Sequence, residues 1–221
     1  MINRELYMEQ ITPFIDKPFV KVITGIRRCG KSVVLRLIRE ELLRRGVSED
    51  YIIYMNFESF EWIDMKEAKA LYAHIREATK APGKYYILLD EIQEVTDWEK
   101  AVNAFLVDLD VDIYVTGSNS RLLSSEFSTY LAGRYVAFHI MTLSFREYLL
   151  FHDLPLTISV SDRKTEFLKY LRMGGFPAIH TANYDYNAIY KIVYDIYSSV
   201  ILRDTVQRHS IRNVEMLERV V

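Results

Sequence analysis

The fold can be predicted from residues 25–32, which read Gly25-Ile26-Arg27-Arg28-Cys29-Gly30-Lys31-Ser32. This stretch matches the Walker A pattern Gly-x4-Gly-Lys-Ser/Thr in full, with an apolar run before it and a helical pattern after it. Glycines let the backbone curl so that successive N–H groups point inward, and the positive end of the following helix also attracts phosphate. The sequence therefore predicts a phosphate-binding loop between a strand and a helix.

Residues Gly25 to Val33 are the predicted nucleotide contacts. Lys31 is expected to reach the β- and γ-phosphates, and Ser32 is expected to ligate magnesium through its hydroxyl. Arg27 and Arg28 have two interpretations, because loop arginines either contact phosphate or remain solvated. A chance match in a glycine-containing turn is the alternative for the whole loop, and the flanking strand and helix count against it.

The chain up to about residue 143 alternates apolar runs with segments of helical periodicity. The expected strands are Phe19–Thr24, Tyr51–Phe57, Tyr85–Leu89, Asp112–Thr116 and Tyr135–Met141. The expected helices are Lys31–Arg45, Lys66–Thr79, Trp98–Val107 and Leu122–Tyr130. Several of these strands lack polar alternation, which is typical of a parallel sheet covered on both faces. The pattern predicts a three-layer α/β domain over residues 1–143.

Residues 144–221 show no strand pattern and are expected to form a smaller all-helical region. Ser144-Phe145-Arg146-Glu147 matches a capping box that opens a helix. Gly174-Gly175-Phe176-Pro177 forces a break in the helical pattern. The expected helices are Ser144–His152, Asp162–Met173, Asn187–Arg208 and a last one from Val214. This last helix has neither a cap nor a polar tail, so we expect the chain to be truncated at its C-terminus.

Two carboxylates, Asp90 and Glu91, follow the apolar run Tyr85–Leu89 in the form of a Walker B motif. Asp90 is expected to bind magnesium, directly or through a water. Glu91 is expected to orient the attacking water or to take its proton. A solvated helix cap is the alternative for an Asp-Glu pair after a strand, and the phosphate loop favours the functional interpretation.

Small hydrogen-bonding side chains follow the fourth expected strand, in the order Thr116-Gly117-Ser118-Asn119-Ser120. Ligands of open α/β sheets lie at the carboxyl ends of the strands, so this cluster can face a nucleotide. Either Ser118 or Asn119 could hold the lytic water or touch the γ-phosphate, and Asn119 is favoured for its reach. An ordinary Asx turn is the competing interpretation.

These motifs together resemble the AAA-type branch of P-loop ATPases. The resemblance rests on Gly25–Ser32, Leu88-Leu89-Asp90-Glu91-Ile92-Gln93 and Val115-Thr116-Gly117-Ser118-Asn119. Proteins of that branch carry an extra strand between the Walker A and Walker B strands, and the expected strand at residues 51–57 supplies it. The resemblance implies strand order 5-1-4-3-2, ATP and Mg2+ as ligands, and hydrolysis of ATP.

A closer resemblance is to prokaryotic ATP-binding proteins that join an AAA-type domain to a helical, winged-helix-like region. It rests on Leu131-Ala132-Gly133-Arg134, Leu143-Ser144-Phe145-Arg146-Glu147-Tyr148 and Gly174-Gly175-Phe176-Pro177. In many of these proteins a nuclease-like C-terminal domain of unknown function follows. The resemblance makes Arg134 a candidate arginine finger or sensor arginine, in cis or in trans, and a surface arginine capping a turn is the alternative. Without a second-sensor motif, assembly with further copies of the chain stays an open expectation.

Composition limits the other functional classes. Lys and Arg number 28 against 30 Asp and Glu, so the net charge of −2 gives no overall attraction to nucleic acid. Basic residues of the helical region are mixed with acids, which leaves DNA as a weak candidate partner beside a protein client. No apolar run is long enough to span a bilayer. With the single cysteine, Cys29, this predicts a cytoplasmic location.

Two other functions remain open. A nucleotide-dependent switch or scaffold would hold ATP with little turnover and act through partners. A small-molecule kinase or GTP-binding protein is disfavoured, because no Asn-Lys-x-Asp motif occurs and the Asp-Glu pair suits a water nucleophile. The sequence thus favours Mg-dependent ATP hydrolysis coupled to a conformational change.

Overall fold

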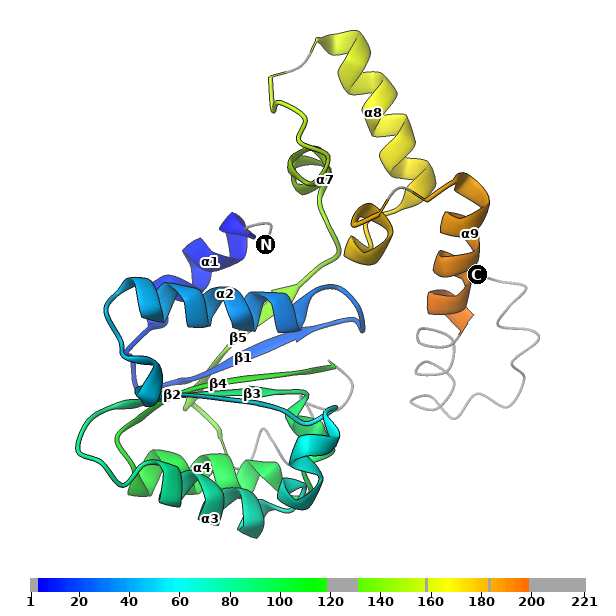
Figure 1. Cartoon of the computed structure of the whole chain (residues 1–221). Helices are drawn as coiled ribbons and strands as arrows, with labels where there is room; N and C mark the ends of the chain where they lie inside the picture. The colour runs from blue at the N-terminus through cyan, green and yellow to red at the C-terminus, as the bar shows by residue number, and fades with distance from the viewer. Residues whose placement is uncertain (1–3, 119–130, 158, 183, 199–221) are drawn as a thin grey trace. The chain divides into compact units, whose positions relative to one another are not determined.

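The computed structural model describes residues 4–118, 131–157, 159–182 and 184–198 (Figure 1). Contacts between these residues divide the chain into two compact units. One unit comprises the described residues of 4–25 and 30–140, and the other comprises residues 26–29 and the described residues from 141 onward. The first is built of strands and helices, and the second is helical.

A five-stranded parallel sheet forms the centre of the α/β unit. Its strands, in order across the sheet, are β2 (Ile52–Asn56), β3 (Tyr85–Asp90), β4 (Val111–Ser118), β1 (Val20–Gly25) and β5 (Tyr135–Ile140). Order 2-3-4-1-5 is the predicted 5-1-4-3-2 taken from the other edge, so the predicted topology is confirmed. Strand β1, which leads into the phosphate loop, therefore lies inside the sheet between β4 and β5.

Helices cover both faces of this sheet, which confirms the three-layer prediction (Figure 1). One face carries α1 (Glu5–Ile11) and α2 (Lys31–Arg44), and the other carries α3 (Ala68–Ala78) and α4 (Trp98–Asp108). Short 3-10 turns are η1 (Thr12–Phe14), η2 (Glu49–Tyr51), η3 (Phe60–Met65) and η4 (Ile92–Glu94). Helix α1 was not among the predicted elements. The predicted helix Leu122–Tyr130 lies outside the described residues.

The core of the α/β unit consists of side chains from the strands and from the helices packed on them. Strands β1 and β3 are buried at every residue, as expected for predominantly apolar strands covered on both faces. Fully buried members of the main cluster are Val20, Val22, Met55, Phe57, Leu71, Ile75, Ile87, Leu89, Ile92, Val102, Phe105, Val115 and Leu131. Each large aliphatic or aromatic side chain buried in this way stabilises the fold by about 1.5–3 kcal/mol.

A buried polar network closes the amino end of the sheet. Lys21 forms an ion pair with Asp112, and both side chains are almost completely buried. Asp112 also accepts hydrogen bonds from the Tyr114 hydroxyl at 2.8 Å and from the backbone N–H of Asp16 at 2.9 Å. The Tyr86 hydroxyl donates to Asp16 at 2.8 Å. These contacts explain why charged residues interrupt the apolar runs of β1 and β4, and they join strands β1, β3 and β4 at this end.

The helical unit contains α7 (Phe145–Phe151), α8 (Val160–Met173), η5 (Pro177–His180) and α9 (Tyr186–Ile196). The predicted capping box is confirmed, because Ser144 Oγ accepts from the N–H of Glu147 while the Glu147 carboxylate accepts from the N–H of Ser144. Helix α9 is the described part of the predicted helix Asn187–Arg208. The predicted helix from Val214 lies outside the described residues, and the winged-helix-like character stays a prediction.

The break at Gly174-Gly175-Phe176-Pro177 has a packing reason. Gly174 ends α8 with φ of 79°, a left-handed conformation that glycine adopts readily. The N–H of Leu143 donates to the carbonyl oxygen of Gly175 at 2.6 Å. A Cβ atom at Gly175 would lie 2.6 Å from the carbonyl oxygen of Leu143, which leaves no room for a side chain. The second glycine therefore allows the segment before α7 to pair with the turn after α8.

Candidate nucleotide site

The phosphate loop joins the end of β1 to the start of α2. Three of its residues have positive φ, namely Gly25 at 153°, Arg28 at 67° and Gly30 at 105°. The value at Arg28 is uncommon for a residue with a side chain, and such local strain is concentrated at ligand sites. Arg27 and Arg28 are exposed, whereas Cys29 is fully buried. The loop thus has the backbone curl that the glycine spacing predicts.

The start of α2 provides the other half of a phosphate site. The carbonyl oxygen of Gly30 accepts hydrogen bonds from the N–H groups of Val33 and Val34, both at 3.1 Å. The first N–H groups of any α-helix lack partners within the helix, so those of Lys31 and Ser32 are oriented toward the helix start. An anion placed there would meet both the helix dipole and the ammonium group of Lys31.

Asp90 ends β3 at the carboxyl edge of the sheet and is completely buried. Its Oδ1 accepts a hydrogen bond from the Thr116 hydroxyl, and its Oδ2 accepts one from the Tyr54 hydroxyl at 3.1 Å. Burial and the neighbouring Asp90 carboxylate raise the pKa of Tyr54 to about 12. Tyr54 therefore stays protonated and keeps donating to the carboxylate.

A magnesium ion fits the donors at Asp90. No described lysine, arginine or histidine forms an ion pair with this carboxylate, and a buried negative charge without a counterion is costly. Each oxygen has one hydroxyl donor and retains a further lone pair. Among the described residues no cluster of three or more His, Cys, Asp or Glu side chains forms a metal cage. Such an ion would therefore take few ligands from the protein, as Mg2+ does when phosphate oxygens and waters supply the others.

Glu91 is held at three points. Its backbone is left-handed, with φ of 55° and ψ of 48°, and its N–H donates to Thr116 Oγ1 at 2.9 Å. Its Oε1 lies 3.3 Å from Lys31 Nζ, and its Oε2 accepts from Gln93 Nε2 at 2.5 Å. The structure thus brings together the lysine of the phosphate loop and the glutamate beside Asp90, two residues chosen from separate motifs.

The polar cluster after β4 is only partly described. Ser118 pairs with Gly25 in the register of β4 and β1, so its backbone lies beside the first residue of the phosphate loop. Asn119 lies outside the described residues. Its predicted contact with the lytic water or the γ-phosphate stays a prediction.

Arg134 is not brought to this edge of the sheet. Its carbonyl oxygen accepts from the N–H of Val20, the first residue of β1, at 2.9 Å, and its guanidinium donates to Asn103 Oδ1 at 3.0 Å. Strand β1 has six residues, and the five steps from Val20 to Gly25 span about 17 Å. Arg134 precedes β5, and parallel strands all begin at the edge opposite the phosphate loop, so the residue lies away from the loop of its own chain. Its role as an arginine finger or sensor arginine stays a prediction.

Sequence reasoning missed three contacts of the site. Tyr54 and Thr116 hold Asp90, and Gln93 holds Glu91, but none of the three was assigned a role. Thr116 and Gln93 fall inside the motifs that carry the resemblance, so their closeness in sequence to the site residues could have indicated a role for them. Tyr54 lies on β2, opposite Leu88 of β3. Its contact depends on sheet register, which spacing along the chain does not reveal.

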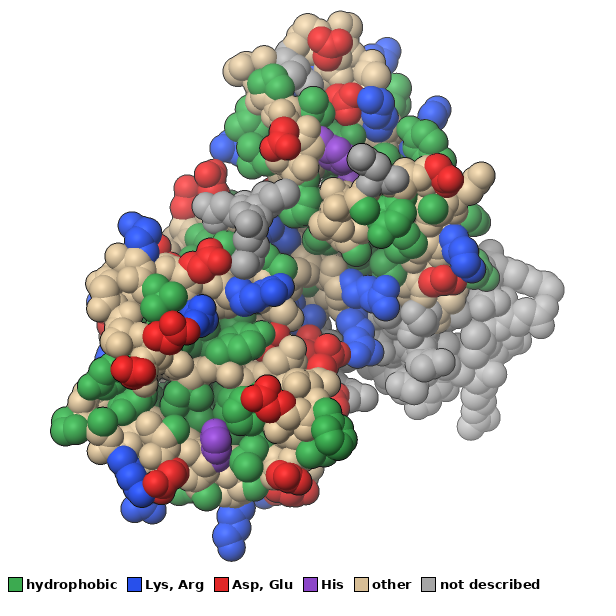
Figure 2. Space-filling view, viewed as in Figure 1, with side chains coloured by type: hydrophobic (Ala, Val, Ile, Leu, Met, Phe, Trp, Pro, Cys, Tyr) green, Lys and Arg blue, Asp and Glu red, His purple; other side chains and the backbone are tan. Residues whose placement is uncertain are grey.

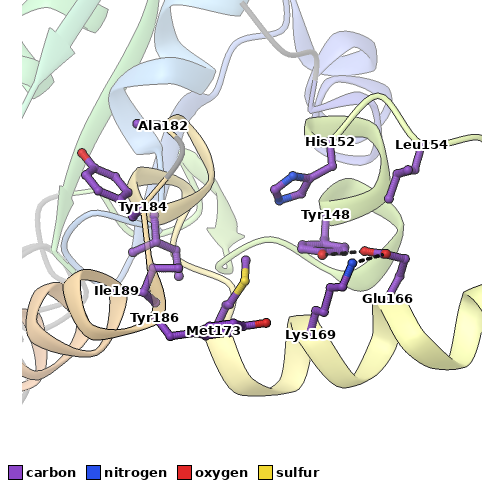
Figure 3. A pocket seen from close by; sticks show the side chains of 11 residues that line it. Tyr148, His152, Leu154, Glu166, Lys169, Met173, Ala182, Tyr184, Tyr186 and Ile189 are labelled. Atoms are coloured by element: carbon purple, nitrogen blue, oxygen red, sulfur yellow. Dashed lines mark hydrogen bonds and ion pairs between the residues drawn. The ribbon is translucent and has the colours of Figure 1, made fainter.

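The helical unit has a cavity of its own, of about 420 Å3 (Figure 3). Its charged side chains contact one another, since Glu166 accepts from the Tyr148 hydroxyl at 2.9 Å and from Lys169 at 2.7 Å. The hydrogen bond from Lys169 lowers the pKa of Glu166. Nearby, the ring nitrogens of His152 and His180 lie 3.1 Å apart, and burial lowers the pKa of His180. These contacts tie α7, α8 and η5 together.

The surface carries charges of both signs. On the face shown in Figure 2, lysine and arginine side chains are interspersed with acidic ones. Exposed apolar and aromatic side chains occur on α8 and near α9, including Val160, Phe167, Leu171, Tyr186, Tyr190 and Tyr194. Among the described residues, no helix combines the length and the apolar character needed to cross a membrane.

Comparisons with known proteins agree with this geometry. A family model described as "AAA domain" matches residues 17–149. An "Uncharacterized protein" of Haemophilus influenzae is 39% identical over all of this chain and 54% of its own length. "Uncharacterized protein MJ1544" of Methanocaldococcus jannaschii is 34% identical over 99% of this chain and 48% of its own length. The chain thus spans about half the length of these curated relatives.

A solved structure with a similar fold is the AMPPCP-bound DnaA of Aquifex aeolicus. It aligns with a TM-score of 0.51 and 14% sequence identity, over 94% of this chain and 67% of the DnaA chain. At that identity the likeness concerns the fold alone.

Proposed function

The chain belongs to the AAA-type P-loop ATPase family, and on that premise we propose that it binds ATP with magnesium and hydrolyses it. The observation that carries the proposal is the meeting of Lys31 and Glu91 beside the buried Asp90. A lysine for phosphate, a carboxylate for a metal ion and a second carboxylate for water then lie at one edge of the sheet.

Binding of ATP is assigned to the backbone from Gly25 to Val33 and to Lys31. The curled loop directs N–H groups at the phosphates, and the dipole of α2 adds to the attraction. Lys31 neutralises charge on the β- and γ-phosphates. Because Lys31 contacts Glu91 in this structure, we propose that it turns from that carboxylate to the phosphates when a nucleotide binds.

Magnesium is assigned to Ser32 and Asp90. The Ser32 hydroxyl lies in the first turn of α2, and Asp90 provides a buried carboxylate that two hydroxyls orient. When bound, the ion would neutralise charge that develops on the phosphate oxygens.

Activation of water is assigned to Glu91, whose backbone is fixed by Thr116. The carboxylate takes a proton from the water as its oxygen attacks the γ-phosphorus. Asn119 is proposed as a second contact of that water. Arg134 is proposed to act only on the nucleotide of another copy of the chain, because it lies at the opposite edge of its own sheet.

A second candidate function is a nucleotide-dependent switch with little turnover. The observation that favours it is the Lys31–Glu91 ion pair itself, since a glutamate held by a lysine is not free to accept a proton. In that case ATP would change the structure of the site without rapid cleavage. Steady-state turnover near the uncatalysed rate, with tight ATP binding retained, would support this function over hydrolysis.

Coupling to the helical unit and the identity of the client are also proposals. The curated relatives are about twice as long as this chain. The protein or DNA on which the proposed conformational change acts should therefore be sought with the longer proteins. A cytoplasmic location stays a prediction.

The experiment compares ATP binding and turnover in three proteins. The wild-type chain should hydrolyse ATP only when magnesium is present. Glu91→Gln should bind ATP with unchanged affinity and lose turnover by at least about 100-fold, as expected on removal of a general base. The control Glu77→Gln alters a carboxylate that is exposed and pairs with the neighbouring Lys80, so its turnover should equal that of the wild type. Normal hydrolysis by Glu91→Gln would show that the base is another residue.

A further inference from the structure

Gln93 contacts the proposed base directly. It lies in η4, two residues after Glu91, and donates from Nε2 to Glu91 Oε2 at 2.5 Å. A carboxylate only accepts hydrogen bonds, so the amide nitrogen rather than the amide oxygen must face it. Because the acceptor is charged, this hydrogen bond is among the stronger ones available to a glutamine.

The amide oxygen of Gln93 indicates that the contact between its Nε2 and Glu91 is more than a result of packing. Gln93 Oε1 is buried and has no hydrogen-bond partner, and it is the one buried side-chain atom in this condition among the described residues. Buried polar atoms are almost always paired, because an unpaired one carries a free-energy cost. The glutamine therefore leaves its acceptor unsatisfied while it keeps its donor on Glu91.

The two oxygens of the Glu91 carboxylate have different partners. Oε1 lies 3.3 Å from Lys31 Nζ, and Oε2 accepts a hydrogen bond from Gln93 Nε2. The backbone of Glu91 is fixed separately by its N–H bond to Thr116, so only the side-chain torsions remain to be set. When Lys31 turns to the phosphates of a nucleotide, Oε1 is released and Gln93 is the contact that still orients the carboxylate.

We propose that Gln93 is a positioning residue, which holds Oε2 of Glu91 and leaves Oε1 as the oxygen that receives the proton of the attacking water. The inference rests on the proposed hydrolysis. In that step the water loses one O–H bond, and its proton passes to Oε1 of Glu91. The water oxygen bonds to the γ-phosphorus, the bond from that phosphorus to the β–γ bridging oxygen breaks, and ADP leaves with the electron pair.

The test is steady-state kinetics of Gln93→Met and Gln93→His, with ATP affinity measured separately. Gln93→Met removes the donor while keeping a chain of similar length, so kcat should fall by up to about 100-fold, as when a reacting group is misplaced. KM and the ATP dissociation constant should stay within about twofold of the wild type, since Gln93 does not contact the predicted phosphate site. Gln93→His restores an N–H donor and should recover much of the lost kcat.

The matched control is Glu94→Gln in the same turn, whose side chain pairs with Lys66 at 3.9 Å, and its kcat should be unchanged. If Gln93→Met fails to fold, Gln93→Ala, which also removes the donor and adds no charge beside Glu91, replaces it in the comparison. A kcat of Gln93→Met equal to the wild-type value overturns the inference, as does a fall matched by weaker ATP binding. Absence of turnover in the wild-type chain instead removes the proposed function, and the inference with it.

Discussion

Lys31 Nζ lies 3.3 Å from Oε1 of Glu91, and the two side chains are 3% and 11% exposed. One residue begins the helix after the phosphate loop, and the other follows β3. Both have proposed roles toward ATP, yet here each neutralises the other. A nucleotide whose phosphates bind Lys31 would therefore also free the Glu91 carboxylate. Nucleotide binding and the activation of water by Glu91 would then be coupled through this ion pair.

The ion pair predicts a specific pattern of stability without nucleotide. Lys31→Met leaves the buried Glu91 carboxylate without its cation and should lower the free energy of unfolding by about 3 kcal/mol. Adding Glu91→Gln should recover most of that loss, because position 91 then carries no charge that needs a cation. Chemical denaturation of the two single variants and the double variant measures the coupling. Strictly additive effects would show that the pair contributes nothing to the folded state.

Thr116 predicts a difference between two small substitutions. Its hydroxyl accepts from the N–H of Glu91 and donates to Asp90, so Thr116→Val leaves a buried N–H group unpaired. We expect a loss of about 1–3 kcal/mol in the free energy of unfolding. Thr116→Ser keeps the hydroxyl and should lose much less. If chemical denaturation gives Thr116→Val and Thr116→Ser the same free energy of unfolding, the role assigned to the Thr116 hydroxyl is wrong.

His180 predicts a pH dependence of the helical unit. Burial lowers the pKa of its imidazole below 6.5, and the nearby His152 acts in the same direction, although a hydrogen bond to Gly174 opposes them. Between that lowered pKa and 6.5 the unfolded chain binds more protons than the folded chain. Stability should therefore be greater above 6.5 and fall as the pH decreases through this window.

The measurement for His180 is the melting temperature between about pH 7.5 and 5.5. His180→Gln keeps a donor for the Gly174 carbonyl and an acceptor for His152 but does not titrate. Its melting temperature should fall less steeply with acidification than that of the wild type. Identical slopes for the two proteins would assign the pH dependence to other groups.

The position of Arg134 predicts that replacing this residue leaves the affinity for nucleotide unchanged. The residue is exposed, lies beside Val20 at the amino edge of the sheet and donates to the half-buried Asn103. Arg134→Ala should leave the ATP dissociation constant of the isolated chain unchanged and alter stability by less than about 1 kcal/mol. Titration with a fluorescent ATP analogue checks the affinity. A tenfold larger dissociation constant would indicate that the Arg134 guanidinium contacts the nucleotide bound to the same chain.

Much of the fold could be predicted from the sequence because its signals are local. Apolar runs, a glycine-rich loop and alternating helical periodicity each arise within a few residues, and together they indicate the parallel sheet, whereas the strand order was implied only by the resemblance to AAA-type P-loop ATPases. Helix α1 escaped prediction because it has only seven residues and no side-chain cap. The position of Arg134 was available in principle, since a residue just before a parallel strand lies at the edge opposite the Walker motifs.

The contacts inside the site were less predictable because they cross between strands. Tyr54 and Asp90 meet through the register of β2 and β3, and Lys31 meets Glu91 across the sheet edge. Spacing along the chain contains no information on those distances. The motif residues were identified by type, whereas their partners became visible only with the sheet assembled.

The position of β1 has a consequence for the synthesis of the protein. Of the five described strands of this sheet it is made first, yet the strands on either side of it are β4 and β5, so Val20 pairs with Tyr135 and Gly25 with Ser118. Residues 20–25 therefore wait unpaired until about residue 140 has emerged. A nascent chain shorter than this lacks both neighbours of the strand that leads into the phosphate loop, so the proposed binding of ATP would stabilise the domain only after β5 is made.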